Sequence, residues 1–200
     1  MTEPPQVSDG EALCDEDWYG AELQGVRLTD CRLTDIDLTD AVITGSNFTG
    51  CQLRNVQFNA ARLTDTAFVR CTFERCNFFD ATITGCKFVG STLTDCILRP
   101  MAVTGGDWSF VDLAGADLRG VQFTRVRMRE ADLHGTILRD AQLRGVDLSG
   151  SVIRGATFAG ADLRESQLPD VPWGTADLTD AIIDGVQALA LVEAWGLRVL

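Results

Sequence analysis

The chain is poor in the residues from which most catalytic and metal-binding sites are built. Its 200 residues include a single histidine, His134. No Ser-His-Asp arrangement, glycine-rich phosphate loop or helical metal motif occurs in a context that would support it. We therefore predict a protein that is not an enzyme and has no cofactor and no metal ion.

Long apolar runs and excess positive charge are also absent. No stretch of 18 apolar residues occurs, and the N-terminal residues are acidic and proline-rich rather than signal-like. We accordingly expect a cytoplasmic protein without membrane association. Acidic residues outnumber basic ones by 29 to 17, which gives a net charge of −12. This balance disfavours direct binding to nucleic acid.

What the chain does have is a hydrophobic residue at every fifth position from Leu13 to Ile183, in one unbroken phase. These 35 positions, called centres below, comprise 18 Leu, 8 Phe, 4 Ile, 3 Trp, Val103 and Met128. A small residue lies two positions before 31 of the 33 centres from Leu23 to Ile183, and the two exceptions are Ile36 and Met101. Six of the seven cysteines occupy this small-residue column, without CxxC pairing. We interpret them as buried space-fillers rather than metal ligands or disulfides.

A period of five fits neither an α-helix, in which the centres would drift around the axis, nor a flat strand, in which they would alternate between faces. It fits a chain that bends at every fifth residue, where Gly, Asp and Asn recur. Four such blocks close a square coil of about 20 residues, in which centres and small residues face inward, and coils stack about 4.8 Å apart. Phe48, Phe68, Phe88 and Trp108 should then form a ladder, and we expect Gly106 to make room for the indole.

Blocks of this kind resemble the repeats of the pentapeptide-repeat proteins. Residues 116–120 read Ala-Asp-Leu-Arg-Gly and residues 161–165 read Ala-Asp-Leu-Arg-Glu. The resemblance covers nearly the whole chain and implies an all-β solenoid. This would be a right-handed quadrilateral β-helix of about nine coils, followed by a short C-terminal α-helix. We expect a flexible leader over residues 1–10, the β-helix over 11–185, and a helix and dimerisation segment over 186–200.

The C-terminal segment is most similar to the mycobacterial fluoroquinolone-resistance members of this family. The similar segments are Trp173-Gly174-Thr175-Ala176-Asp177-Leu178, Gln187-Ala188 and Gly196-Leu197, together with Arg99-Pro100 and Leu118-Arg119-Gly120. The resemblance implies a protein that binds DNA gyrase as a mimic of duplex DNA, modulates or inhibits it, and reduces fluoroquinolone sensitivity. The alternative is a pentapeptide-repeat scaffold for a different protein partner, with no gyrase role.

The last residues predict a helix that begins after Asp184 as its N-cap and ends at Gly196. This helix has almost no polar face, and such helices are buried on more than one side. We expect one side to plug the end of the solenoid and the rest to be buried in a homodimer. The predicted dimer interface comprises Val186, Leu189, Ala190, Val192, Trp195, Leu197 and Val199.

Assigning each five-residue block to one of the four sides of the coil separates the charges of the sequence. The side with centres from Trp18 to Leu178, called the acidic face below, has nine acidic and three basic residues, net −6. Its neighbour, with centres from Leu13 to Trp173, has a net charge of −3. The side with centres from Leu28 to Leu168, called the neutral face, has five residues of each sign. Complementary charge steers partners and selects among them. The predicted partner-binding acids are Asp117, Asp140, Asp162, Asp177, Asp180 and Asp184.

Overall fold

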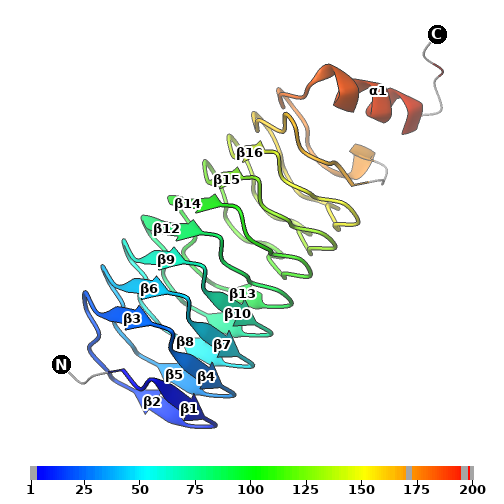
Figure 1. The fold of residues 1–200 in the computed structure, drawn as a ribbon. Helices are drawn as coiled ribbons and strands as arrows, with labels where there is room; N and C mark the ends of the chain where they lie inside the picture. Colours follow the sequence, from blue (N-terminus) through cyan, green and yellow to red (C-terminus); the bar gives the residue numbers. More distant parts are fainter. Residues whose placement is uncertain (1–3, 170–172, 195–197, 199–200) are drawn as a thin grey trace.

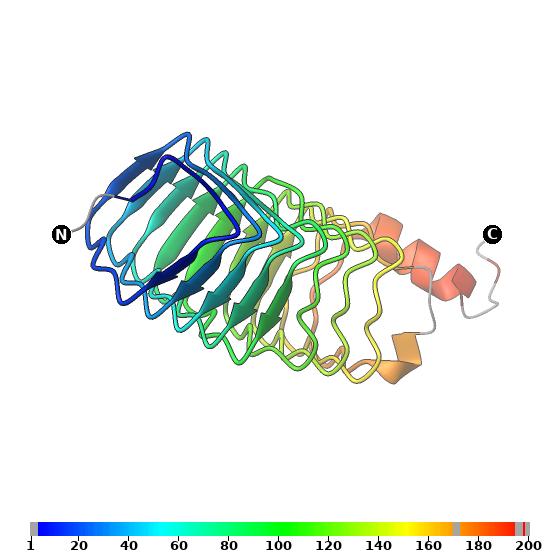
Figure 2. The ribbon, with the colours of Figure 1, turned by 90° about the horizontal axis from the view of Figure 1, so that it is seen from below.

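The computed structural model of the chain describes residues 4–169, 173–194 and 198. These residues form a four-sided parallel β-solenoid, followed by one helix at its C-terminal end (Figures 1 and 2). Strands of successive coils pair in parallel, as Leu28 does with Phe48 and Phe48 with Phe68. The stacking period predicted from four five-residue blocks per coil is confirmed.

Three sides of the solenoid are parallel sheets of short strands. The first sheet contains β1 (Val7–Asp9), β4 (Arg27–Thr29), β7 (Asn47–Thr49) and β10 (Ala67–Val69). The second contains β2 (Ala12–Cys14), β5 (Arg32–Thr34), β8 (Gln52–Arg54), β11 (Thr72–Glu74) and β13 (Thr92–Thr94). The third contains β3 (Glu22–Gln24), β6 (Val42–Thr44), β9 (Arg62–Thr64), β12 (Ala81–Thr84), β14 (Met101–Thr104), β15 (Gln122–Thr124) and β16 (Gln142–Arg144).

The fourth side is the acidic face, and its coils pair through isolated bridges. Asp17 pairs with Asp37, and the same spacing continues to Ile97 and then, after one interruption between Ile97 and Asp117, from Asp117 to the bridge between Thr157 and Asp177. The longest sheet has seven strands, so about seven coils of the solenoid contain regular strands, whereas the sequence predicts nine coils. The difference arises because the remaining coils keep the same register through bridges, as at Asp162 and Ile182.

A left-handed residue makes each corner. Every fifth residue from Gly10 to Glu165 has a positive φ, except Pro100, whose ring fixes φ and which follows a cis peptide bond. Asp, Asn and Gly tolerate this conformation, so the predicted corner residues are confirmed. Ala60 and Phe110 also adopt it, at φ 53° and 59°, because inter-coil backbone hydrogen bonds, including those from their own amides to the carbonyls of Phe79 and Arg129, fix the corner irrespective of the side chain.

The centres fill the axis of the solenoid. Phe48 and Phe68 stack with ring centroids 4.6 Å apart, Phe88 lies 5.0 Å from Phe68, and Trp108 lies 4.2 Å from Phe88. The predicted ladder is therefore confirmed. The expected reason for Gly106 is wrong, because a Cβ there would collide with the backbone of Cys86 rather than with the indole. Gly106 allows two neighbouring coils to approach each other.

The small-residue column is buried beside the centres. Cys31, Cys51 and Cys71 are at most 1% exposed, and burial raises the pKa of the Cys86 thiol to about 11. Both findings fit neutral space-filling side chains. All seven cysteines are free thiols.

The solenoid begins earlier than residue 11, which corrects the predicted extent of the leader. Val7–Asp9 form β1, and Ser8 lies in register with the centre Leu28. Ser8 is 6% exposed, and its hydroxyl donates to the Glu11 carboxylate at 2.6 Å. A polar residue is tolerated here because the end of the solenoid lets its hydroxyl find a partner. Because Ser8 stands where the repeat has a hydrophobic centre, the five-residue hydrophobic pattern does not predict this first strand.

A 3₁₀ helix, Trp173–Thr175, and the helix α1, Gly185–Ala194, close the C-terminal end. Leu191 of α1 packs against the last centres, beside Leu178 and Ile183. The Gln187 side chain is 6% exposed and donates to the backbone carbonyls of Leu163 and Ser166 at 2.6 and 2.7 Å. The helix thus caps the core with one of its sides. Within the described residues, no helix is long and apolar enough to cross a membrane.

Replacing one ladder residue should destabilise the solenoid strongly. Phe68 is fully buried between two rings, so Phe68→Ala should lower the free energy of unfolding by about 3–5 kcal/mol. Phe79, which is 49% exposed, provides the control, and Phe79→Ala should change it by less than about 0.5 kcal/mol. Denaturant unfolding of both variants measures the difference, and equal effects would contradict the stacked core.

Candidate functional site

The acidic face ends, on the C-terminal side, in a hollow of about 290 Å³ bordered by three aspartates. Asp177 accepts hydrogen bonds from the Thr179 hydroxyl at 2.7 Å, the Thr179 amide at 3.0 Å and the Thr157 hydroxyl at 3.1 Å. These bonds, those from Thr179 above all, lower the pKa of Asp177. Its carboxylate therefore stays charged near neutral pH.

Asp140 and Asp180 border the same hollow and are exposed. Both occupy corner positions with positive φ, which point their side chains away from the core. Neither forms an ion pair with another of the described residues. Arg139 is the one cation at the hollow, so three carboxylates and one guanidinium leave it net negative.

Two of the predicted partner-binding acids are neutralised by arginines. Asp117 accepts from Arg119 at 2.6 and 2.8 Å and from Arg99 at 2.7 Å. The Arg119 guanidinium, more than any other group, holds the pKa of Asp117 well below its usual range. Two arginines on one aspartate make this group net positive, so Asp117 adds no free negative charge to the acidic face.

The same arrangement recurs at Asp162. Its carboxylate accepts from Arg144 at 2.6 Å and from Arg164 at 2.8 and 2.9 Å. In both groups one arginine lies on the preceding coil and a second follows the aspartate two positions later in the sequence. The stacking of one coil on the next brings these side chains together, so this spacing is the sequence signal that would have identified the pairing. Asp117 and Asp162 therefore bring no unpaired negative charge to the candidate surface, and their contact with a partner stays a prediction.

Asp184 has a structural role as the N-cap of α1. Its Oδ1 accepts from the amides of Val186 and Gln187 at 2.9 and 3.0 Å, and Oδ2 accepts from the amide of Glu165 at 2.9 Å. The Gln187 side-chain oxygen accepts from the Asp184 amide at 2.8 Å, which completes a capping box. These backbone donors, led by Gln187, lower the pKa of Asp184. Asp184 ties the helix to the solenoid.

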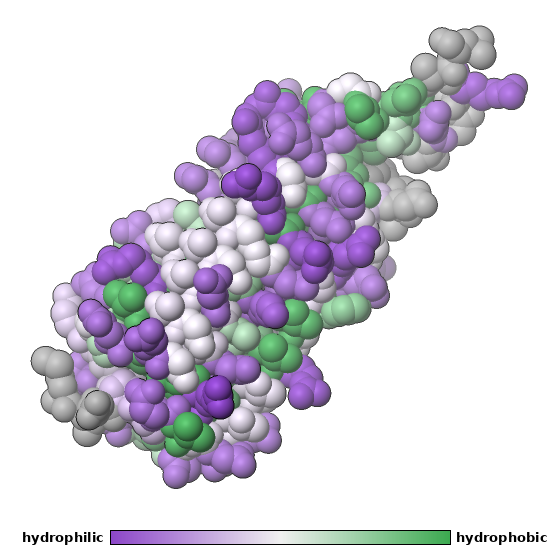
Figure 3. All heavy atoms as spheres, viewed as in Figure 1, coloured by the Kyte–Doolittle hydropathy of each residue, from purple (hydrophilic) through white to green (hydrophobic). Residues whose placement is uncertain are grey.

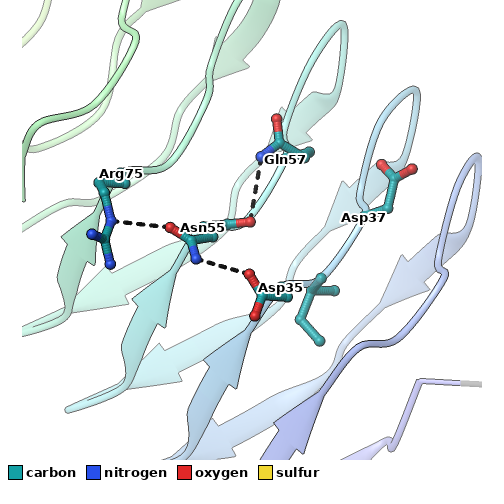
Figure 4. Close-up of a pocket in the computed structure, with 6 residues that line it drawn as sticks. Asp35, Asp37, Asn55, Gln57 and Arg75 are labelled. Atoms are coloured by element: carbon teal, nitrogen blue, oxygen red, sulfur yellow. Dashed lines mark hydrogen bonds between the residues drawn. The ribbon is translucent and has the colours of Figure 1, made fainter.

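At its N-terminal end the acidic face meets the neighbouring side of net charge −3 in a polar hollow of about 410 Å³ (Figure 4). The Asn55 side chain donates to Asp35 at 2.8 Å and accepts from Arg75 at 3.1 Å. Gln57 donates to the Asn55 carbonyl at 3.3 Å. Asp37, also labelled in Figure 4, follows Asp35 by two residues on the same coil and pairs with Gln57 across the coils, and its carboxylate accepts from the Thr39 amide at 2.9 Å.

A row of three arginines divides the acidic face between these two ends. Arg99, Arg119 and Arg139 occupy the same repeat position in successive coils, and all three are exposed. The acids Asp17, Asp37 and Asp40 lie on the N-terminal side of the row, and Asp140, Asp177 and Asp180 lie at its C-terminal end. The face is therefore acidic at both ends and basic in the middle, a division that its net charge does not reveal.

The predicted dimer residues fall on the outer side of α1 where the structure describes them. Val186 is 80% exposed and Leu189 is 41% exposed, and Ala190 is also exposed. Val192 is half-buried. Trp195, Leu197 and Val199 lie outside the described residues. The helix therefore has one capping side, which includes Gln187 and Leu191, and an opposite apolar side that none of the described residues of one protomer covers.

The described residues contain no group of three or more side chains that could hold a metal ion. Side chains of hydrophilic or intermediate hydropathy cover most of the surface seen in Figure 3, and hydrophobic ones form smaller spots.

Comparison with known proteins gives a family and a fold. A family profile described as "Pentapeptide repeats (8 copies)" matches residues 21–59, 57–95, 109–145 and 141–171. No curated protein matches the sequence. A trypsin-treated form of QnrB1, described as a plasmid-mediated fluoroquinolone resistance protein, superimposes with a TM-score of 0.60 at 22% identity, covering 97% of this chain and 100% of that one. Full-length QnrB1 gives a TM-score of 0.51 at 20% identity, covering 96% of this chain and 100% of that one. Likeness at this identity shows the fold.

Removing the N-cap should loosen α1 from the solenoid. Asp184→Ala deletes three hydrogen bonds to backbone amides, so hydrogen exchange at Val186 and Gln187 should accelerate relative to wild type. Because the pKa of folded Asp184 is depressed, its contribution is present above its unfolded pKa of about 4 and is lost as the pH falls through the folded value.

Asp184→Asn is the matched control, because asparagine caps helices about as well as aspartate. It should preserve slow exchange near neutral pH and remove the acid dependence that this group contributes. Rapid exchange at Val186 and Gln187 in the wild type itself would contradict the capping arrangement.

Proposed function

Because the chain belongs to the pentapeptide-repeat family, we propose that it is a DNA-mimicking protein that binds DNA gyrase, modulates or inhibits it, and so reduces fluoroquinolone sensitivity. The fold similarity to QnrB1 supports this proposal, as does the resemblance of the C-terminal segment described above. Members of this family are scaffolds that typically act without catalysis, and we propose a binding role in the cytoplasm, where gyrase acts on DNA.

The observation that carries the proposal is the cluster of charged carboxylates at the C-terminal end of the acidic face. Asp140, Asp177 and Asp180 project from a rigid solenoid whose backbone is bonded coil to coil. A rigid acidic rod presents to a basic groove a field similar to that of duplex DNA, and complementary fields raise association rates.

The charge per unit length of the solenoid determines how closely its electrostatic field can match that of duplex DNA. A net charge of −12 along a rod of about 40 Å, the length of coils stacked about 4.8 Å apart, gives roughly one charge per 3.3 Å, about half the density of B-DNA. The arginine row concentrates this charge further into the two ends. We therefore propose that the electrostatic attraction to the partner comes from the two ends of the acidic face, rather than uniformly from its whole length.

Removing charge from the C-terminal acidic cluster should slow association with gyrase. Asp177→Asn with Asp180→Asn should leave the fold unchanged, because both side chains lie outside the core. The association rate with purified gyrase should fall several-fold at low salt, and the difference should shrink as salt screens the charges. Surface plasmon resonance at about 50 and 200 mM salt measures both effects.

A variant with the same net charge provides the control. Asp30→Asn with Glu130→Gln removes two exposed acids from the neutral face, so it should bind as wild type does. Equal weakening by both pairs, or wild-type binding that is insensitive to salt, would reject electrostatic mimicry. Failure of the wild type to bind gyrase or alter its supercoiling activity would favour the scaffold alternative.

We also propose that the protein forms a homodimer through the outer side of α1. Val186 and Leu189 leave apolar surface uncovered in one protomer, and burying it against a second copy would remove it from water. Two protomers joined in this way would bring their C-terminal acidic clusters toward one centre and lengthen the rod.

Charges on the outer side of α1 should prevent this dimer. Val186→Asp with Leu189→Asp should yield a monomer in sedimentation velocity at micromolar concentration, because the carboxylates would be buried unpaired. The inner contacts of Gln187 and Leu191 are untouched, so the circular dichroism should be preserved. A wild-type protein that sediments as a monomer would contradict the dimer.

A further inference from the structure

Two large apolar side chains stand exposed on the acidic face, in adjacent coils. Phe79 is 49% exposed and Ile97 is 52% exposed. Ile97 pairs with Asn77 across the coils, and its carbonyl accepts from the Phe78 amide at 2.7 Å. Ile97 therefore lies directly above Asn77, which precedes Phe79 by two residues on the same coil and the same side of the solenoid. We call Phe79 and Ile97 the apolar pair.

The solenoid does not need apolar residues at these positions. The position of Phe79 is filled by Thr39 and Asn59 in the two preceding coils, and that of Ile97 by Gln57 and Asn77. The inter-coil hydrogen bonds are the same with either kind of side chain, as Phe58 to Asn77 and Phe78 to Ile97 show at 2.7 Å each. The apolar pair is therefore not explained by folding.

The charges around the apolar pair differ on its two sides. Toward the C-terminus lies the net-positive group of Arg99, Asp117 and Arg119. Toward the N-terminus lie the exposed carboxylates of Asp80 and Asp40. The pair thus stands at the boundary between a positive and a negative strip. A phosphate backbone has no counterpart to either the apolar spot or the positive strip.

We propose that the apolar pair is the anchor by which this face docks onto a protein surface with an apolar pocket, flanked by a cationic group opposite Asp80 and an anionic group opposite Arg99. Exposed aromatic side chains that fill a partner's pocket carry much of the energy of protein interfaces. This inference rests on the proposed function, because it places the pocket in the gyrase surface that the acidic face contacts. Charge then guides association, and the apolar pair slows dissociation.

The test replaces each residue with one that the repeat already accepts. Phe79→Asn with Ile97→Asn introduces the side chain of Asn59 and Asn77 at equivalent positions. Binding to purified gyrase should weaken at least about tenfold, mainly through faster dissociation. The loss should be the same at low and high salt, whereas the loss in the Asp177→Asn, Asp180→Asn variant should fade with salt.

The control removes a matched pair of apolar side chains from other sides. Phe110, at a corner of the neutral face, and Val152 are 55% and 50% exposed. Phe110→Asn with Val152→Thr should bind gyrase as wild type does, because asparagine suits the left-handed corner at position 110 and threonine occupies the position of Val152 in two earlier coils.

Each outcome decides between the inference and the function it rests on. Wild-type affinity of the Phe79→Asn, Ile97→Asn variant, together with weakened binding of the aspartate variant, would overturn the anchor and leave gyrase binding standing. Absence of gyrase binding by the wild type would overturn both. If wild-type protein self-associates and the double asparagine variant does not, the pair binds a second copy and the proposal is wrong.

Discussion

The inter-coil backbone hydrogen bond, repeated in the same register from each coil to the next, is the constraint on which the rest of this structure depends. It holds from the pairing of Val7 with Arg27 to that of Asp162 with Ile182. Keeping it requires a corner at every fifth residue and an inward pair of one small and one large side chain in each block. The corner takes a left-handed conformation even where the residue is alanine, arginine or phenylalanine. The strain at these positions is accepted because the hydrogen bonds on both sides fix the backbone.

The same register organises the surface. Outward side chains at matching positions of successive coils stand in rows, so charges in neighbouring coils either accumulate or pair. Arg99, Arg119 and Arg139 accumulate in one row, whereas Asp117 and Asp162 each join two arginines. A solenoid therefore displays its charge as strips with defined lengths. In this protein the strips leave acidic ends, a basic middle and an apolar pair at one boundary, which is a more specific surface than a net charge of −12 suggests.

The periodic features of the fold could be predicted from the sequence, because they depend on a pattern that repeats many times. The coil length, the inward centres, the aromatic ladder and the N-cap at Asp184 all follow from residue type and spacing. Features that depend on a single contact could not. The first strand was hidden because Ser8 replaces a hydrophobic centre, and the role of Gly106 depends on how closely two coils approach. The pairing of Asp117 with Arg99 and Arg119 neutralises a carboxylate that the charge count treats as free. Capping by Gln187 uses a buried polar side chain in a helix whose pattern indicated only apolar packing.

The central claim is that the acidic face occupies the site on gyrase that duplex DNA occupies. Competition between the two ligands tests this directly. A fluorescent duplex bound to purified gyrase should be released as this protein is added, with no complex containing both, and the release should weaken as salt rises. A stable complex of gyrase, duplex and this protein, seen as unchanged anisotropy of the labelled duplex together with co-sedimentation of all three, would contradict the account.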